Sequence, residues 1–105
     1  MSRNLCLTRQ YFGLATRIEC AIRPLAGDNG LWTVLFAAGM TGEQPSAVKS
    51  QGPFRGPFEA AHLLESIVEN LTRQGYEMAE DPPIWCLHLQ AHLRLLNRSH
   101  EQLAL

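Results

Sequence analysis

Apolar and polar residues alternate along much of the first half of the chain. In residues 12–23 one set of alternate positions is mainly apolar, whereas the other set carries two arginines and a glutamate, a pattern that predicts a half-buried strand. Residues 31–40 are apolar at both sets of positions, which is typical of a central strand or of one whose outer face is also covered. Residues 47–52 are short and polar, as suits an edge strand. We therefore expect a three-stranded antiparallel sheet within residues 11–54, preceded by a flexible arm at residues 1–10.

The second half of the chain predicts two helices. Pro57 suits a first helical position and Gly75 a C-terminal cap, so residues 57–75 form the first predicted helix. The apolar stripe of this helix consists of Ala60, Ala61, Leu63, Leu64, Ile67, Val68 and Leu71. Asp81 followed by two prolines signals a second helix, which we expect within residues 82–103. Three strands followed by two helices (βββαα) predict an α+β fold with an antiparallel sheet in a single domain, residues 1–105.

The second predicted helix carries two apolar stripes. The first consists of Ile84, Leu87, Ala91 and Leu95, and the second of Trp85, Leu89, Leu93, Leu96 and Leu103. Together they cover more than half of the circumference, wider than the ~100° stripe that packing on one core requires. One interpretation is that the helix lies in a groove between the sheet and the first helix, with both stripes buried. The alternative is that one stripe faces a partner chain, because exposed Trp and Leu on a monomer are rarely without a use.

We favour the partner interpretation, with Trp85 as the anchor of the interface, because buried Trp is over-represented among interface hot spots. The first stripe, beginning at Ile84, would then hold the helix on its own core. The residues predicted to contact the partner are Trp85, Leu89, His92, Leu93 and Leu96. A self-complementary stripe of this kind also predicts a homodimer.

Composition narrows the class of protein. A chain of 105 residues and 11.7 kDa suits one domain. Its formal charge of −1 lacks the positive surplus that phosphate binding needs, which counts against nucleic acid as the main partner. The sequence contains no apolar run of the roughly 18–20 residues that a membrane span requires, and no recognisable signal peptide. Three cysteines without CxxC spacing suggest reduced thiols, so we expect a cytoplasmic protein.

Residue patterns that support catalysis or metal binding are sparse. His88 and His92 are spaced i, i+4 on one helical face, but two ligands are fewer than zinc requires. Cys86 stands near a helix start, where the dipole favours a thiolate, yet nothing marks a base for it. The carboxylates form no pair suited to acid–base catalysis, and residues 27–30 lack the lysine of a phosphate loop. We therefore expect neither an enzyme nor a bound cofactor or metal.

A small RNA-binding domain of the βββα type is the alternative function. The basic residues of the arm and the first strand are Arg3, Arg9, Arg17 and Arg23. With Tyr11 as a stacking platform they could contact RNA. However, the first predicted helix opens with Pro57, Phe58 and Glu59 and lacks the basic start of a double-stranded-RNA domain. Solvated arginines are the simpler interpretation.

The layout of the chain resembles known small proteins. A long predicted hairpin is followed by the segment GPFRGPF at residues 52–58, by a helix ending at Gly75-Tyr76, and by a last helix that opens with Pro82-Pro83-Ile84-Trp85. This arrangement is similar to small conserved proteins of pseudomonads. With its last helix it also resembles the small quorum-sensing anti-activators of the QslA type. The resemblance implies a protein that binds a LuxR-type transcriptional regulator such as LasR, occupies its dimerisation surface and so prevents DNA binding.

Overall fold

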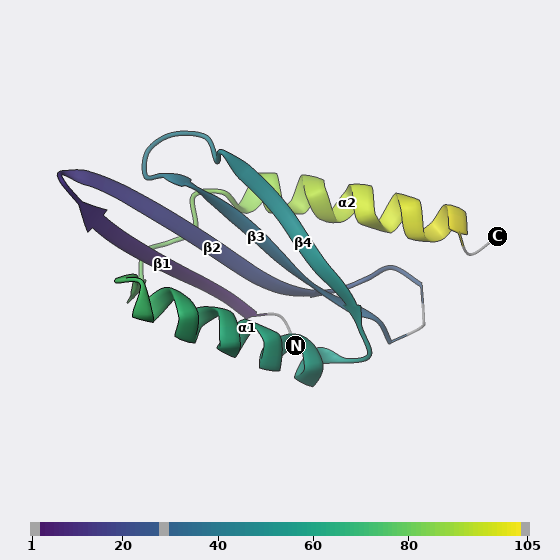
Figure 1. Ribbon diagram of the computed structural model, residues 1–105. Coiled ribbons are helices and arrows are strands. Elements are labelled where there is room, and N and C mark those ends of the chain that lie inside the picture. The colour runs from purple at the N-terminus through teal and green to yellow at the C-terminus, as the bar shows by residue number, and fades with distance from the viewer. Residues whose placement is uncertain (1–2, 28–29, 104–105) are drawn as a thin grey trace.

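Five strands and two helices make up the part of the chain that the computed structural model describes, residues 3–27 and 30–103 (Figure 1). The strands are β1 (Arg3–Tyr11), β2 (Leu14–Pro24), β3 (Trp32–Met40), β4 (Ala47–Phe54) and β5 (Glu77–Ala79), and the helices are α1 (Pro57–Arg73) and α2 (Cys86–Leu103). The strands form one sheet in the order β4-β3-β2-β1-β5, and every neighbouring pair is antiparallel. The fold is therefore α+β with an antiparallel sheet, as predicted, but with five strands instead of three.

The first additional strand is the segment expected to be a flexible arm. Residues 3–11 form β1, which pairs with β2 along its whole length. Cys6 and Leu7 are buried on opposite faces of the sheet, and this burial holds the strand in place. Phe12 and Gly13, expected to begin the next strand, form the turn between β1 and β2, with φ values of 51° and 78°. Positive φ at both central residues suits the tight turn of a hairpin.

The second additional strand, β5, lies in the segment expected to be a connector. Its three residues pair with Cys6–Thr8 of β1. A strand of this length carries too few residues to show a period of two, so its sequence alone did not predict it.

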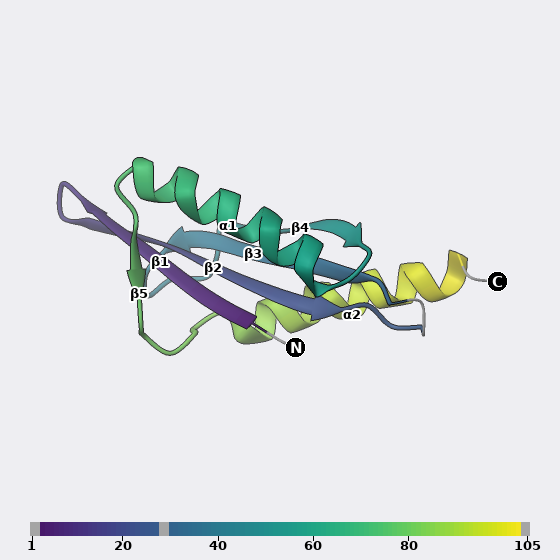
Figure 2. The ribbon, with the colours of Figure 1, turned by 90° about the horizontal axis from the view of Figure 1, so that it is seen from below.

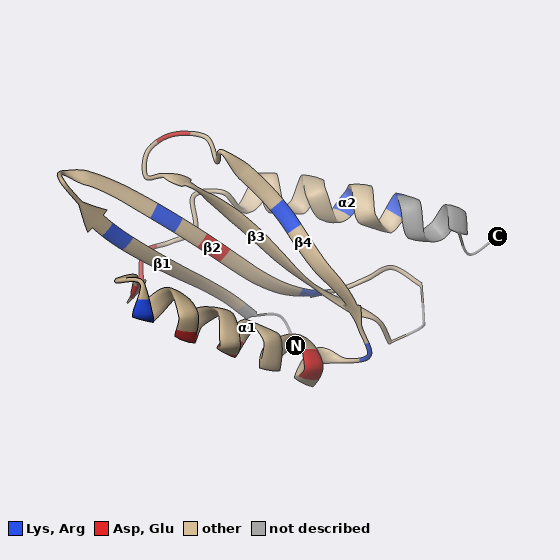
Figure 3. Cartoon of the chain, in the orientation of Figure 1, with Lys and Arg blue, Asp and Glu red and all other residues tan. Residues whose placement is uncertain are grey.

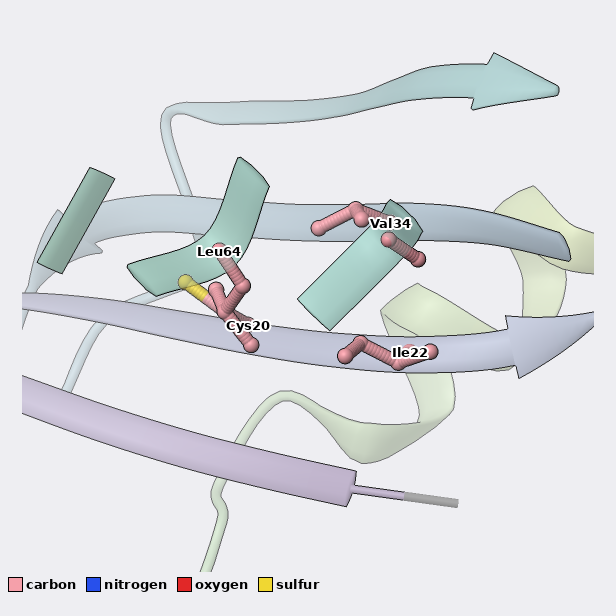
Figure 4. Close-up of a cluster of buried hydrophobic side chains, with 5 residues drawn as sticks. Cys20, Ile22, Val34 and Leu64 are labelled. Atoms are coloured by element: carbon pink, nitrogen blue, oxygen red, sulfur yellow. The ribbon is translucent and has the colours of Figure 1, made fainter. Parts of the chain in front are cut away.

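The two helices cover opposite faces of the sheet (Figure 2). On one face α1 packs on β2 and β3, and the buried cluster there consists of Cys20, Ile22, Val34, Ala60 and Leu64 (Figure 4). On the other face α2 packs on the same strands, and the buried cluster consists of Ala21, Leu35, Ala37, Trp85 and Leu89. Both faces of β3 are therefore covered, which confirms the prediction from its two apolar sets of positions. α2 does not lie in a groove between the sheet and α1.

α1 begins where predicted and ends close to the predicted position. Pro57 occupies the first turn, where its missing N–H costs nothing. At the other end the backbone N–H groups of Gly75 and Tyr76 donate to the carbonyl oxygens of Thr72 and Leu71, at 3.1 and 3.0 Å. Gly75 has a φ of 96°, so this is the glycine-dependent cap that the sequence predicted. The helix itself ends at Arg73.

The molecule is elongated, measuring 50 × 25 × 18 Å along its principal axes. The β1–β2 hairpin extends beyond the helices at one end, and the last turns of α2 extend beyond the sheet at the other (Figure 1). Among the described residues, neither helix combines the length and the apolar character needed to cross a membrane.

Candidate protein-interaction surface

The outward face of α2 exposes a row of apolar side chains. Leu87 is 76% exposed and Leu95 58% exposed, and Ile84, just before the helix, is 48% exposed. Ala91 is also exposed and lies on the same face of the helix. We call these four residues the outer stripe. An apolar row of this kind on a surface helix is typical of an interaction site.

The opposite face of α2 carries the residues that were expected to contact a partner. Trp85 is 2% exposed and Leu89 is buried beside it against Ala21, Leu35 and Ala37 of the sheet. Two further leucines pack against the same cluster, namely Leu93 and Leu96. The side chain of Leu103 lies outside the described residues. The expected orientation of the helix was therefore wrong: the stripe beginning at Trp85 holds the helix on its own sheet, and the stripe beginning at Ile84 faces outward.

Two polar contacts on the inner face explain this orientation. The indole Nε1–H of Trp85 donates to the carbonyl oxygen of Glu43 at 2.9 Å, so the ring is buried with its polar atom satisfied. Nε2 of His92 lies 3.2 Å from Oγ of Ser50 on β4. His92, expected at a partner interface, is therefore part of the contact between α2 and the sheet.

A buried ion pair on β2 positions the start of α2. The side chains of Arg17 and Glu19 are 3% and 2% exposed, with Nε of Arg17 2.7 Å from Oε2 of Glu19. The Glu19 carboxylate accepts the backbone N–H of Ile84 at 2.8 Å and of Trp85 at 3.1 Å. Carboxylate oxygens at the N-terminus of a helix satisfy its unpaired N–H groups and interact favourably with its dipole.

Asp81 was the expected helix cap, but its role is different. Its Oδ2 lies 3.6 Å from Nη1 of Arg17, and Nη2 of Arg17 donates to the carbonyl oxygen of Pro82 at 2.9 Å. Arg17 thus joins β2 to the segment that precedes α2, and the helix begins at Cys86, inside the range 82–103 in which it was expected. The outer stripe is consequently presented by a helix that is fixed at its start.

Charge is distributed unequally between the two helices (Figure 3). From Cys86 to Arg98, α2 contains two arginines, Arg94 and Arg98, and no acidic residue. α1 carries three glutamates, at positions 59, 65 and 69, and one arginine at its last residue. On the helical wheel Arg98 falls within the outer stripe, and Arg94 lies beside its Leu87 edge. The surface around the stripe is therefore basic and apolar.

The three cysteines are free and differ in exposure. Burial raises the pKa of the Cys20 thiol to about 12 and also raises the pKa of the Cys6 thiol. A raised thiol pKa leaves little of the thiolate that nucleophilic catalysis requires at neutral pH. Cys86 is half-buried at the first residue of α2. In the part of the chain that the structure describes, no three His, Cys, Asp or Glu side chains form a group able to hold a metal ion.

The arginines expected to form an RNA-binding platform are separated and engaged within the chain. Arg9 and Arg17 lie on opposite faces of the sheet, because Arg9 is paired with Thr16. Arg9 donates to the carbonyl oxygen of Gln74 at 3.0 Å and lies over the ring of Tyr76 at 4.8 Å. The other two arginines are also engaged: Arg17 forms the buried ion pair with Glu19, and Arg23 donates to Oδ1 of Asn4 at 2.8 Å. The side chain of Arg3 lies outside the described residues.

Comparison with known proteins identifies a family. PA4575-like proteins match residues 1–104. The chain belongs to the PA4575-like family. This agrees with the expected similarity to small proteins of pseudomonads. No curated protein and no solved structure matches this member of the PA4575-like family.

Sequence reasoning missed the residues that position the surface. Arg17 and Glu19 lie at the polar positions of an alternating strand and were assigned to solvent, whereas α2 covers them. Two features of the sequence pointed to this arrangement. β3 is apolar on both faces, so each face needs a cover, and the second helix has a large enough apolar surface to cover the face that α1 leaves open. Together these features could have placed α2 on the face opposite α1.

Proposed function

We propose that this protein is a non-enzymatic interaction module that binds a protein partner through the outer stripe of α2. The observation that carries the proposal is the exposure of Leu87 and Leu95 on one face of a helix whose other face is already buried. Burying an exposed Leu side chain contributes roughly 1.5–3 kcal/mol, so a few such residues are enough for a specific contact.

The surface is well suited to docking because it is held in position before the partner arrives. The ion pair of Arg17 and Glu19 fixes the start of α2, and Trp85 fixes the first turn against the sheet. A preorganised helix loses little conformational freedom on binding. Because Arg98 lies in line with the stripe towards the C-terminus of α2 and Arg94 lies beside it, we expect the matching surface of the partner to be apolar with acidic residues near that end.

A LuxR-type transcriptional regulator is the candidate partner. This proposal is supported by the resemblance in layout to anti-activators of the QslA type, and by an apolar helix face of the kind that can occupy a dimerisation surface. The protein would then block dimerisation of the regulator and so its binding to DNA. The family match itself names no partner.

Capture experiments with a double variant of α2 and a control variant of α1 test the proposed surface. The purified wild-type protein, the double variant Leu87→Lys/Leu95→Lys and the control Phe58→Lys are used as bait in nuclease-treated lysate. Phe58 is an exposed apolar residue on α1, so its replacement changes charge and hydrophobicity on the other helix. We expect a protein captured by the wild type and by the control to be lost with the α2 variant, while all three baits keep the same circular dichroism spectrum.

The identity of the partner is tested separately. A purified LuxR-type regulator is incubated with its operator DNA, and the wild-type protein is expected to release the DNA in a gel-shift assay whereas the α2 variant is not. Unchanged capture by the α2 variant would rule out the outer stripe. Capture that disappears on nuclease treatment would instead favour the RNA-binding alternative.

A further inference from the structure

The outer edge of β1 is only partly covered. β5 pairs with Cys6–Thr8, the middle of a strand that runs from Arg3 to Tyr11. Within the described residues, no strand lies beside Arg3–Leu5 on this side. The backbone N–H and C=O groups of an unpaired edge point outward and form a template for a further strand.

Two hollows flank this open edge, one on each side of the sheet. The hollow beside α1 has a volume of about 260 Å³, and the hollow beside the segment leading to α2 has a volume of about 200 Å³. Leu5 and Met78 line both, so the two hollows adjoin the same stretch of β1. Met78 is exposed and would be covered by anything bound there.

The rims of both hollows are acidic. Glu65 and Glu69 of α1 line the first hollow, and Glu80 and Asp81 line the second. Glu69 and Asp81 have arginine partners within the chain. Among the described side chains that line the two hollows, none is a lysine or an arginine, and Glu65 and Glu80 are the rim carboxylates to which no salt bridge is assigned in the described residues.

We propose that this edge binds an extended segment of another protein that has apolar residues in its centre and basic residues at its ends. The segment adds to the sheet as a short strand beside Arg3–Leu5. Successive side chains of a strand point to opposite faces, so alternate residues of the segment enter the two hollows. Its basic residues then lie beside the rim carboxylates. This site is distinct from the outer stripe of α2 and does not depend on the function proposed above.

A synthetic peptide tests the proposal directly. The probe is the peptide acetyl-Lys-Val-Leu-Val-Lys-amide, which is titrated into the full ¹⁵N-labelled protein. At about millimolar peptide, binding with a free energy of about 4 kcal/mol is strong enough to be detected. We expect saturable shifts of the backbone signals of Asn4, Leu5 and Met78, and slower amide hydrogen exchange in residues 3–5. The same peptide with proline in place of its leucine lacks the central N–H and is expected to bind at least about fivefold more weakly.

Charge reversal supplies the matched controls. Glu65→Lys places a lysine on the rim and is expected to weaken binding about fivefold or more, because a like charge then faces the basic peptide. Glu43→Lys makes the same change in net charge at an exposed position that lines neither hollow and is expected to leave the affinity within about twofold.

Three results would overturn the proposal. The first is the absence of saturable shifts at Asn4 and Leu5. The second is equal binding of the proline peptide, which would show that charge alone attracts the probe. The third is slow exchange in residues 3–5 that depends on protein concentration without peptide, which would show that a second copy of the chain covers the edge.

Discussion

At the scale of single residues, the pair formed by Arg17 and Glu19 connects the sheet to the proposed surface. Both are charged residues at alternate positions of a strand, and such positions ordinarily face water. Here α2 covers them, so each charge is compensated by the other and by backbone groups of the segment before the helix. Sequence periodicity identified the strand correctly. It could not show that the polar face is buried, because that depends on where a distant helix packs.

Removing the charge of Glu19 should destabilise the fold strongly. Glu19→Gln leaves the Arg17 guanidinium buried without its counter-charge, and breaking a buried pair in this way costs about 3–5 kcal/mol. The free energy of unfolding is measured by urea denaturation. Glu65→Gln, at an exposed position of α1, is the control and should change stability by less than about 0.5 kcal/mol. A loss below about 1 kcal/mol for Glu19→Gln would show that the pair does not stabilise α2.

The buried thiol of Cys20 predicts a loss of stability at alkaline pH. Its pKa is raised from 9.0 to about 12 by burial, so the unfolded chain ionises this thiol first as the pH rises. The stabilising contribution is therefore complete below pH 9 and is lost progressively between about pH 9 and pH 12. At about pH 10.5 the loss should be of order 2 kcal/mol. Urea denaturation at several pH values measures it, and Cys20→Ala should show a shallower decline than the wild type.

At the scale of elements, both helices could be predicted, but the orientation of α2 could not. α1 has one apolar stripe, so its packing face followed from its sequence. α2 has two stripes of similar apolar content, and a helical wheel alone gives no reason to prefer either. Contacts between residues distant in sequence decide the orientation: the indole N–H of Trp85 donates to the carbonyl oxygen of Glu43, and the Glu19 carboxylate accepts the backbone N–H groups of Ile84 and Trp85 just before the helix. β1 and β5 were missed for a related reason. Their residues do not alternate clearly between apolar and polar, and they form strands because their backbones pair with neighbouring strands.

Truncating one leucine on each face of α2 should separate the two roles of the helix. Leu89→Ala leaves a cavity against the sheet and should cost about 2–5 kcal/mol of unfolding free energy. Leu87→Ala removes an exposed side chain and should change the stability of the free protein by less than about 0.5 kcal/mol. Urea denaturation of the two variants measures both values. Equal losses in the two variants would mean that Leu87 is buried in solution.

At the scale of the whole molecule, the two helices that cover opposite faces of the sheet differ in charge. α1 carries the glutamates, and the described part of α2 carries arginines with no acidic residue up to Arg98 (Figure 3). A net charge of −1 conceals this separation, so composition alone could not reveal a basic apolar face. The separation favours an acidic partner for α2 and a basic partner for the edge of β1.

The predicted homodimer should therefore depend on salt. In a two-fold dimer the same face of each copy meets the other, so pairing through the outer stripe brings Arg94 and Arg98 of both copies into one interface. At ~20 mM salt their repulsion is poorly screened, and light scattering at micromolar concentration should report about 11.7 kDa. At ~1 M salt, where the screening length is about 3 Å, the mass should rise towards twice this value. Leu87→Lys/Leu95→Lys should remain monomeric at every salt concentration, because the apolar contact is lost. A dimer that is complete at low salt and unaffected by this variant would place the interface elsewhere, with the open edge of β1 as the next surface to test.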